Sequence, residues 1–149
     1  LLTDLPLLAK QYDHVVIDGP AGLTEATQSI LELTDLALVP CQPSGIDLRS
    51  ALDVFHLVQR IQAQQEGRPA AYLFLSRAVK GTRLKDEALA ELEKLEIPRL
   101  NTIIHQRQAI ADTFGQAATV WELLGSASVE AAEEFETLFT EIMAIVSNL

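Results

Sequence analysis

The sequence predicts an α/β protein built on a doubly wound, mostly parallel sheet. Short apolar runs and helix-patterned segments alternate along the chain, and the order ends in helices. The apolar runs are continuous rather than alternating with polar residues, which is typical of strands buried on both faces of a parallel sheet. Both features indicate a parallel sheet that is covered by helices on both faces, and the right-handed rule for crossovers then places each helix.

The first half of the chain predicts two strands and one helix. Residues 14–18, with the sequence HVVID, form a short apolar run that ends in a turn of glycine, proline and alanine at residues 19–22. Residues 24–33 place apolar side chains three and four positions apart, which is the spacing of an amphipathic helix. A second strand is predicted at residues 36–40, where prolines end the apolar run.

The second half of the chain continues this alternation. We expect a long helix capped by Asp47, a strand at residues 70–76, a helix at residues 84–95, a strand at residues 100–104 and an amphipathic terminal helix from Val129. The acidic residues of the segment EAAEEFETLFTE, in the terminal helix, lie mostly opposite its apolar stripe at helical spacing. We therefore expect these carboxylates to form a solvated face.

Length and composition indicate the class of protein. The length fits a single domain, residues 1–149, and no apolar run reaches the roughly 18 residues of a membrane span. The formal net charge of −10 argues against a surface broadly coated for nucleic acid. Lys80, Arg83 and Lys85 either form a local basic patch that contacts DNA or belong to a solvated loop and helix start. The single cysteine, Cys41, is expected in the core, which fits a reducing, cytoplasmic compartment.

The carboxylate that follows the first predicted strand is the main candidate for chemistry. Ligands of a doubly wound sheet bind beyond the carboxyl ends of its strands, where Asp18 is expected. An apolar strand that ends in aspartate is the pattern of a Walker B motif, whose carboxylate serves a magnesium ion on nucleotide phosphates. Gly19, Pro20 and Gly22 would let the backbone approach a γ-phosphate closely. The alternative is an aspartate that only caps a turn.

Two longer stretches carry a family resemblance. The segment YDHVVIDGPAGLTEATQSILELTDLALVPCQPSGIDLRSA resembles the centre of the ParA/MinD family of deviant Walker ATPases. The segment LNTIIHQRQAIADTFGQAATVWEL resembles the short plasmid-partition ParA proteins of the ParF kind. The positions that match the first family pattern are Tyr12, Asp13, Asp18, Pro20, Gly22, Asp35, Pro40, Gln42, Pro43, Ser44 and Asp47.

The resemblance implies a P-loop NTPase-like fold of the SIMIBI type and a nucleotide switch. Its cofactors would be ATP or ADP and Mg²⁺, with Asp18 serving the metal and the turn of Gly19, Pro20 and Gly22 sensing the γ-phosphate. Members of the family form ATP-dependent homodimers, segregate plasmids or chromosomes, bind DNA non-specifically in association with the nucleoid, and respond to a centromere-binding ParB- or ParG-like partner. The resemblance also places the adenine pocket at Ser76, Arg77, Ile104, His105 and Gln106.

One departure from the family pattern is large. The family's phosphate-binding loop ends in GK[ST], and no such tripeptide occurs in these residues. The simplest expectation is that residue 1 lies partway into the natural protein and that the chain is the carboxyl-terminal part of the fold. The alternatives are a non-catalytic scaffold that lacks the loop, and a MinD-like membrane-cycling ATPase. The second alternative is weakened by the acidic terminal helix, because membrane-attached relatives end in a basic amphipathic helix.

Overall fold

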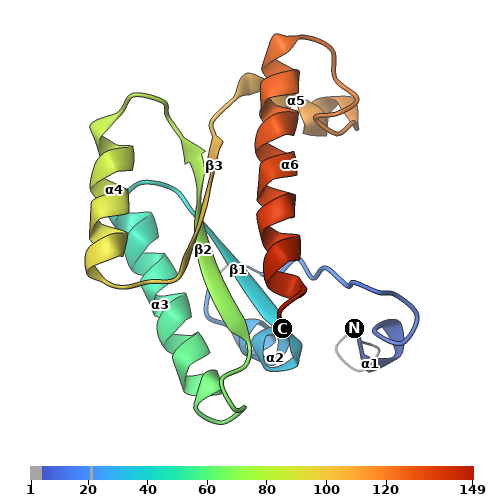
Figure 1. Ribbon diagram of the computed structural model, residues 1–149, viewed down its shortest axis with the longest axis vertical. Coiled ribbons are helices and arrows are strands. Elements are labelled where there is room, and N and C mark those ends of the chain that lie inside the picture. The colour runs from blue at the N-terminus through green and yellow to red at the C-terminus, as the bar shows by residue number, and fades with distance from the viewer. Residues whose placement is uncertain (1–4, 21) are drawn as a thin grey trace.

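The computed structural model describes residues 5–20 and 22–149. Within this part of the chain, three parallel strands form one sheet in the order β1-β2-β3: β1 (Leu36–Cys41), β2 (Ala70–Ala78) and β3 (Arg99–His105). Helices lie on both faces of this sheet (Figure 1). The predicted α/β class with a doubly wound parallel sheet is confirmed.

The helices divide between the two faces. Figure 1 shows α3 and α4 on one side of the sheet and the long α6 on the other. The short α5 lies beside the amino-terminal end of α6, and α1 is a single turn near the start of the described chain. The helices are α1 (Leu5–Leu8), α2 (Glu25–Leu33), α3 (Gly45–Gln62), α4 (Arg83–Lys94), α5 (Gln108–Gln116) and α6 (Ser126–Val146).

The core has one layer on each face of the sheet. On the side of α3 and α4, Val58, Leu73 and Leu92 are almost fully buried and belong to one apolar cluster. On the side of α6, Leu100 and Leu138 are buried with Ile104, and further apolar side chains pack against them. Successive residues of β2 point alternately into these layers, as a strand buried on both faces requires.

The start of α3 differs from the prediction by three residues. Ser44, not Asp47, is the N-cap, because Ser44 has the extended backbone of that position and its Oγ accepts a hydrogen bond from the Asp47 amide at 3.2 Å. The Ser44 hydroxyl also hydrogen-bonds the Asp47 carboxylate. Asp47 therefore lies in the first turn, where its charge is favourable to the helix dipole.

The strand predicted at residues 14–18 is wrong. Residues 14–20 have no regular secondary structure, and Val16 is 96% exposed. Among the described residues, β1 pairs only with β2, and no strand pairs with this segment. An extended segment without a neighbouring strand leaves its backbone N–H and C=O groups to water, so its apolar pattern alone does not make it a strand.

The sequence predicted that the acidic residues of α6 form a solvated face, but not all of them do. The Glu141 carboxylate accepts hydrogen bonds from the backbone amides of Asn101 and Thr102, at 2.7 and 3.0 Å. These amides belong to β3, an outer strand of the sheet, so a helix side chain satisfies donors that strand pairing leaves free. A carboxylate at the border of the apolar stripe is placed to do this, whereas one opposite the stripe is not.

Candidate functional site

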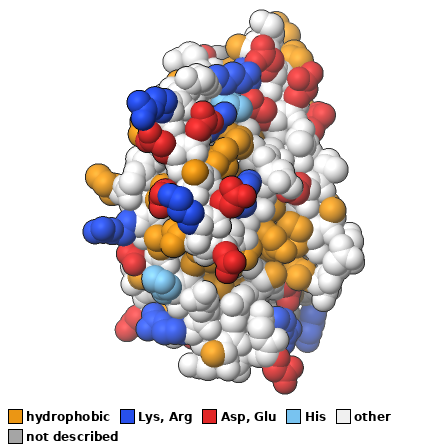
Figure 2. Space-filling model, turned by 60° about the vertical axis from the view of Figure 1, so that its left-hand side comes forward, with side chains coloured by type: hydrophobic (Ala, Val, Ile, Leu, Met, Phe, Trp, Pro, Cys, Tyr) orange, Lys and Arg blue, Asp and Glu red, His pale blue; other side chains and the backbone are white. Residues whose placement is uncertain are grey.

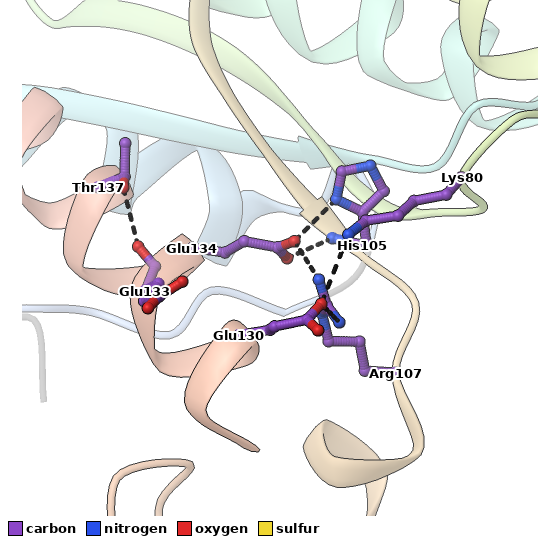
Figure 3. Close-up of polar contacts among 7 residues, drawn as sticks. All are labelled: Lys80, His105, Arg107, Glu130, Glu133, Glu134 and Thr137. Carbon is purple, nitrogen blue, oxygen red and sulfur yellow. Dashed lines mark hydrogen bonds and ion pairs between the residues drawn. The ribbon is translucent and has the colours of Figure 1, made fainter. Parts of the chain in front are cut away.

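A polar cluster joins the loops after β2 and β3 to helix α6. It consists of Lys80, His105, Arg107, Glu130 and Glu134 (Figure 3). Lys80 follows β2, His105 ends β3, Arg107 is the N-cap residue of α5, and the two glutamates lie in the first half of α6. The cluster therefore stands at the carboxyl ends of two neighbouring parallel strands, which is where ligands of such sheets bind.

Glu134 is the centre of this cluster. Its Oε2 accepts a hydrogen bond from the His105 backbone amide at 2.9 Å, and its Oε1 lies 2.9 Å from His105 Nδ1. Arg107 donates to the same Oε1 at 2.6 Å. Burial raises the pKa of the Glu134 carboxyl, but hydrogen bonds from Arg107 and His105 outweigh burial and hold this pKa below its ordinary value. Glu134 is therefore ionised at neutral pH.

Arg107 links the two glutamates of the cluster. One guanidinium nitrogen donates to Glu134, and the other donates to Glu130 at 2.7 Å. Glu130 also lies 3.5 Å from the Lys80 ammonium, so it connects the loop after β2 with the loop after β3. The Arg107 side chain is only 13% exposed, and its Nε is buried without a hydrogen-bond partner among the described residues. The two carboxylates and the largely buried guanidinium thus link both loops to α6, and the Lys80–Glu130 pair, which is more than half exposed, contributes least.

An open cleft of about 440 Å³ lies along β3 and reaches this cluster. The cleft is lined by polar and charged side chains from β3, α6 and the loop after β2. Its lining residues are Lys80, Asn101, Thr102, Ile103, His105, Arg107, Glu130, Glu133, Glu134 and Thr137. The cleft therefore offers both hydrogen-bonding groups and apolar surface.

The end of β2 has an irregular backbone. The pairing of β2 with β3 shifts register between Leu75 and Ala78, and Arg77 has a φ of 55°. The left-handed region costs a residue with a Cβ roughly 1–2 kcal/mol. The other described residues with positive φ that are not glycine lie outside the strands. Ser76 is half-buried here and Arg77 is exposed, so the irregular backbone turns the Arg77 side chain outward.

The residues predicted for the adenine pocket lie at the two strand ends but differ in surroundings. Ile104 is 4% exposed and belongs to the core under α6. Gln106 is exposed, and its amide donates to the Ala78 carbonyl at 2.9 Å, which joins the two strand ends. The His105 ring points to Glu134 of α6. The structure thus brings Ser76, Arg77, His105 and Gln106 to one end of the sheet.

Asp18 is not brought to the same place. Figure 1 shows the segment that follows α1 at the lower end of the sheet, whereas the loops after β2 and β3 are at the upper end. Asp18, Gly19 and Pro20 are exposed. Gly22 has a φ of 84°, and its carbonyl accepts a hydrogen bond from Thr27 Oγ1 at 2.7 Å, which ties the turn to the start of α2. Within residues 5–20 and 22–149, no group of three or more His, Cys, Asp or Glu side chains is arranged to hold a metal ion.

The three basic residues predicted for DNA binding each have an acidic neighbour. Arg83 pairs with Glu87 at 3.2 Å on the exposed side of α4, and Lys85 pairs with Asp86 at 3.2 Å. Lys80 pairs with Glu130 of the polar cluster. Figure 2 likewise shows blue and red side chains interspersed on the face that it displays. The positive charge of these residues is therefore largely balanced in this structure.

Sequence reasoning missed Arg107, Glu130 and Glu134. Glu130 and Glu134 are separated by one helical turn, so they lie on the same side of α6. Arg107 lies three residues beyond the predicted strand end at 104 and two residues beyond the observed end of β3 at His105. The spacing of one helical turn between Glu130 and Glu134, together with a basic residue just after a strand, was the sequence signal for an ion-pair cluster.

Comparison with known proteins gives the family. The family described as VirC1 protein matches residues 6–129, which is most of the chain. The chain belongs to the VirC1 family. It is also 24% identical to a protein named "ParA family protein" from Mycoplasma pneumoniae (strain ATCC 29342 / M129 / Subtype 1) over 146 residues, or 95% of this chain. The chain spans 53% of that relative's length.

This VirC1 family chain is thus ParA-like, and the resemblance stated from its sequence is confirmed. Its parallel sheet with helices on both faces agrees with a P-loop NTPase-like fold of the ParA kind. The family match includes Asp18, all three strands and Arg107, whereas Glu130 and Glu134 lie just beyond its last residue. No helix in the described part of the chain is long and apolar enough to cross a membrane.

Proposed function

We propose that the protein is a partition ATPase that alternates between ATP- and ADP-bound states. The observation that carries this proposal is the VirC1 family match over residues 6–129, together with the similarity to a ParA family protein. The family indicates a partition-related function. We assign the ATPase activity to a complete protein in which a phosphate-binding loop precedes these residues, because no GK[ST] sequence occurs among them.

The loops after β2 and β3 are proposed to hold the nucleotide base. They lie at the carboxyl ends of parallel strands, and the polar cluster fixes them against α6. Arg77 keeps a left-handed backbone at the end of β2, and such strained positions concentrate at functional sites. Its exposed guanidinium can stack on a purine ring, with Ser76 and Gln106 beside it.

Asp18 is proposed to serve Mg²⁺ in the complete protein, where the segment around it would have to lie at the end of the sheet that carries the loops after β2 and β3, and not at the lower end where it lies here. Its carboxylate is a hard oxygen donor, which suits Mg²⁺, and it is exposed. Mg²⁺ keeps several of its waters and uses one or two protein carboxylates beside substrate phosphates, so a single aspartate fits this donor set. The exposed turn of Gly19, Pro20 and Gly22 would be ordered when it contacts the γ-phosphate, and released after hydrolysis.

The assembly is proposed by analogy with the family. ATP would favour a homodimer, and the dimer would bind DNA non-specifically and respond to a centromere-binding partner protein. A net charge of −10 opposes DNA binding by a single subunit. Two subunits would double the number of phosphate contacts, so DNA binding would depend on the ATP state and on salt.

The test is ATP hydrolysis by the complete protein with Asp18→Ala, and with Asp53→Ala, an exposed aspartate of α3, as the matched control. We expect Asp18→Ala to reduce hydrolysis to background with an unchanged circular dichroism spectrum, because positioning of the metal supplies most of the catalysis. Asp53→Ala is expected to hydrolyse ATP at the wild-type rate. Full activity in Asp18→Ala would show that another residue serves the metal.

A second candidate function is a non-catalytic scaffold. It is favoured by the irregular, exposed segment around Asp18 and by the lack of a GK[ST] sequence. Calorimetry of the complete protein with ATP and Mg²⁺ separates the two functions. Magnesium-dependent binding is expected for the ATPase, and a flat titration is expected for the scaffold.

A further inference from the structure

His105 is held by one of its two ring nitrogens. Nδ1 lies 2.9 Å from Glu134 Oε1, and the His105 backbone amide donates to the other oxygen of the same carboxylate at 2.9 Å. An ionised carboxylate only accepts hydrogen bonds, so Nδ1 must carry a proton to make this contact. In the neutral imidazole, Nε2 then has no proton and is an acceptor.

The acceptor nitrogen is directed away from Glu134. Figure 3 shows the second ring nitrogen of His105 on the side of the ring remote from the carboxylate. Among the described residues, this Nε2 has no hydrogen-bond partner, and the atom is not fully buried. The His105 side chain is 19% exposed and lines the cleft. A ligand at the strand ends would therefore meet a ring nitrogen whose lone pair is free.

Arg107 keeps Glu134 in its accepting form. It donates to Glu134 Oε1 at 2.6 Å, and its second donor is bound to Glu130 at 2.7 Å. Because a guanidinium retains its proton at any physiological pH, it offers no acceptor to Glu134 and stabilises the ionised carboxylate. The tautomer of His105 is thus set by residues of α5 and α6 rather than by solvent.

We propose that His105 is a specificity-determining residue of the nucleotide site, that Glu134 is its positioning residue, and that Nε2 selects a 6-aminopurine over a 6-oxopurine. This inference rests on the proposed function, because it presupposes a purine nucleotide at the loops after β2 and β3. An amino group donates a hydrogen bond to Nε2, whereas an oxo group brings a second acceptor against it. A 6-oxopurine would leave the Nε2 acceptor without a donor, so the site discriminates against it.

The first test is the tautomer itself. Long-range nitrogen–proton NMR correlations of the ring nitrogens in the complete protein at pH 7.5, assigned with His105→Gln, report which nitrogen carries the proton. We expect the Nδ1–H form. An Nε2–H ring, or a doubly protonated ring, would overturn the proposal.

The second test compares the affinity for ATP with that for ITP, which differ at position 6 of the purine. Wild type is expected to prefer ATP. His105→Ala should reduce the ratio of affinities about three- to tenfold, the loss of one hydrogen bond. Glu134→Gln should also reduce it, because an amide can donate or accept and so permits both tautomers. His105→Gln serves as a second variant if His105→Ala does not fold.

The matched control is Glu141→Gln, which alters a carboxylate that also links α6 to β3 but at the other end of the strand. Its ratio of affinities should equal that of wild type. An unchanged ratio in His105→Ala, or an equal change in Glu141→Gln, would overturn this proposal while ATP binding remains. If wild type binds neither nucleotide, the proposed function fails and this proposal fails with it.

Discussion

Replacing Glu141 with alanine should remove the contact that holds the amino-terminal end of β3 to α6. Its carboxylate accepts four hydrogen bonds, from the backbone amide and side-chain amide of Asn101 at 2.7 and 3.2 Å, and from the backbone amide and hydroxyl of Thr102 at 3.0 and 2.7 Å. Asn101 is exposed, so water can replace its two contacts. Thr102 is 9% exposed and lines the open cleft, so water can replace the partner of its two donors only in part.

The magnitude follows from the two Thr102 donors. A buried donor left unpaired costs about 1–3 kcal/mol. Two such donors would cost about 2–6 kcal/mol, and access of water from the cleft lowers this cost, so we expect Glu141→Ala to reduce the free energy of unfolding by about 3 kcal/mol. Glu133→Ala is the matched control, because Glu133 is exposed on the same helix, and its change should stay within about 0.5 kcal/mol.

The assay is urea denaturation at pH 7, followed by circular dichroism and by the fluorescence of Trp121. Trp121 stacks on Phe139 of α6, with ring centroids 6.1 Å apart, so its emission reports the docking of this helix. We expect an unchanged slope with denaturant and a lower midpoint. A loss below about 1 kcal/mol, or one no larger than that of Glu133→Ala, would refute the role assigned to Glu141.

Three further predictions concern pH, the thiol and DNA. Burial raises the pKa of the Glu141 carboxyl, but hydrogen bonds from Asn101 and Thr102 outweigh burial and lower it. Its contribution to stability is therefore fully present above the unfolded-state pKa of about 4.3 and is lost as the pH falls through the lower folded-state pKa. Glu141→Gln should flatten the decline of melting temperature below pH 4.3, and an unchanged slope would contradict this. Burial, with a smaller contribution from the Asp47 charge, raises the pKa of Cys41 to about 11, so iodoacetamide at pH 8 should modify it only after unfolding; rapid modification of the native protein would contradict its burial. The triple alanine variant of Lys80, Arg83 and Lys85 should weaken ATP-dependent retention on DNA and reduce the salt slope by up to about 3 per subunit, and unchanged retention would place the DNA contact elsewhere.

Most of the fold could be predicted because its strands are continuous apolar runs with strong turn signals. The runs at residues 36–40 and 70–76 become β1 and β2, which pair with each other along their length. The run at residues 14–18 has the same pattern but no neighbouring strand among the described residues. An apolar pattern shows which side chains a segment can bury. Whether the segment pairs as a strand depends on the presence of a neighbouring strand.

The candidate site could be predicted only in part, because its central contacts join residues far apart in the chain. His105 was predicted at a strand end, where the sequence pattern is informative. Glu134 is separated from it by 29 residues and was assigned to a solvated face. A helical pattern shows the direction in which Glu134 points relative to the apolar stripe, but not that an outer strand and Arg107 lie beside it.

In the proposed function, the bound nucleotide switches the assembly state of the protein. Sedimentation velocity of the complete protein with ATP and Mg²⁺, with ADP and Mg²⁺, and without nucleotide tests it most directly. We predict a dimer with ATP and a monomer with ADP, and we predict that Asp18→Ala abolishes this difference, because a ligand shifts an equilibrium only by its differential affinity for the two states. The same sedimentation coefficient under all three conditions would contradict the account.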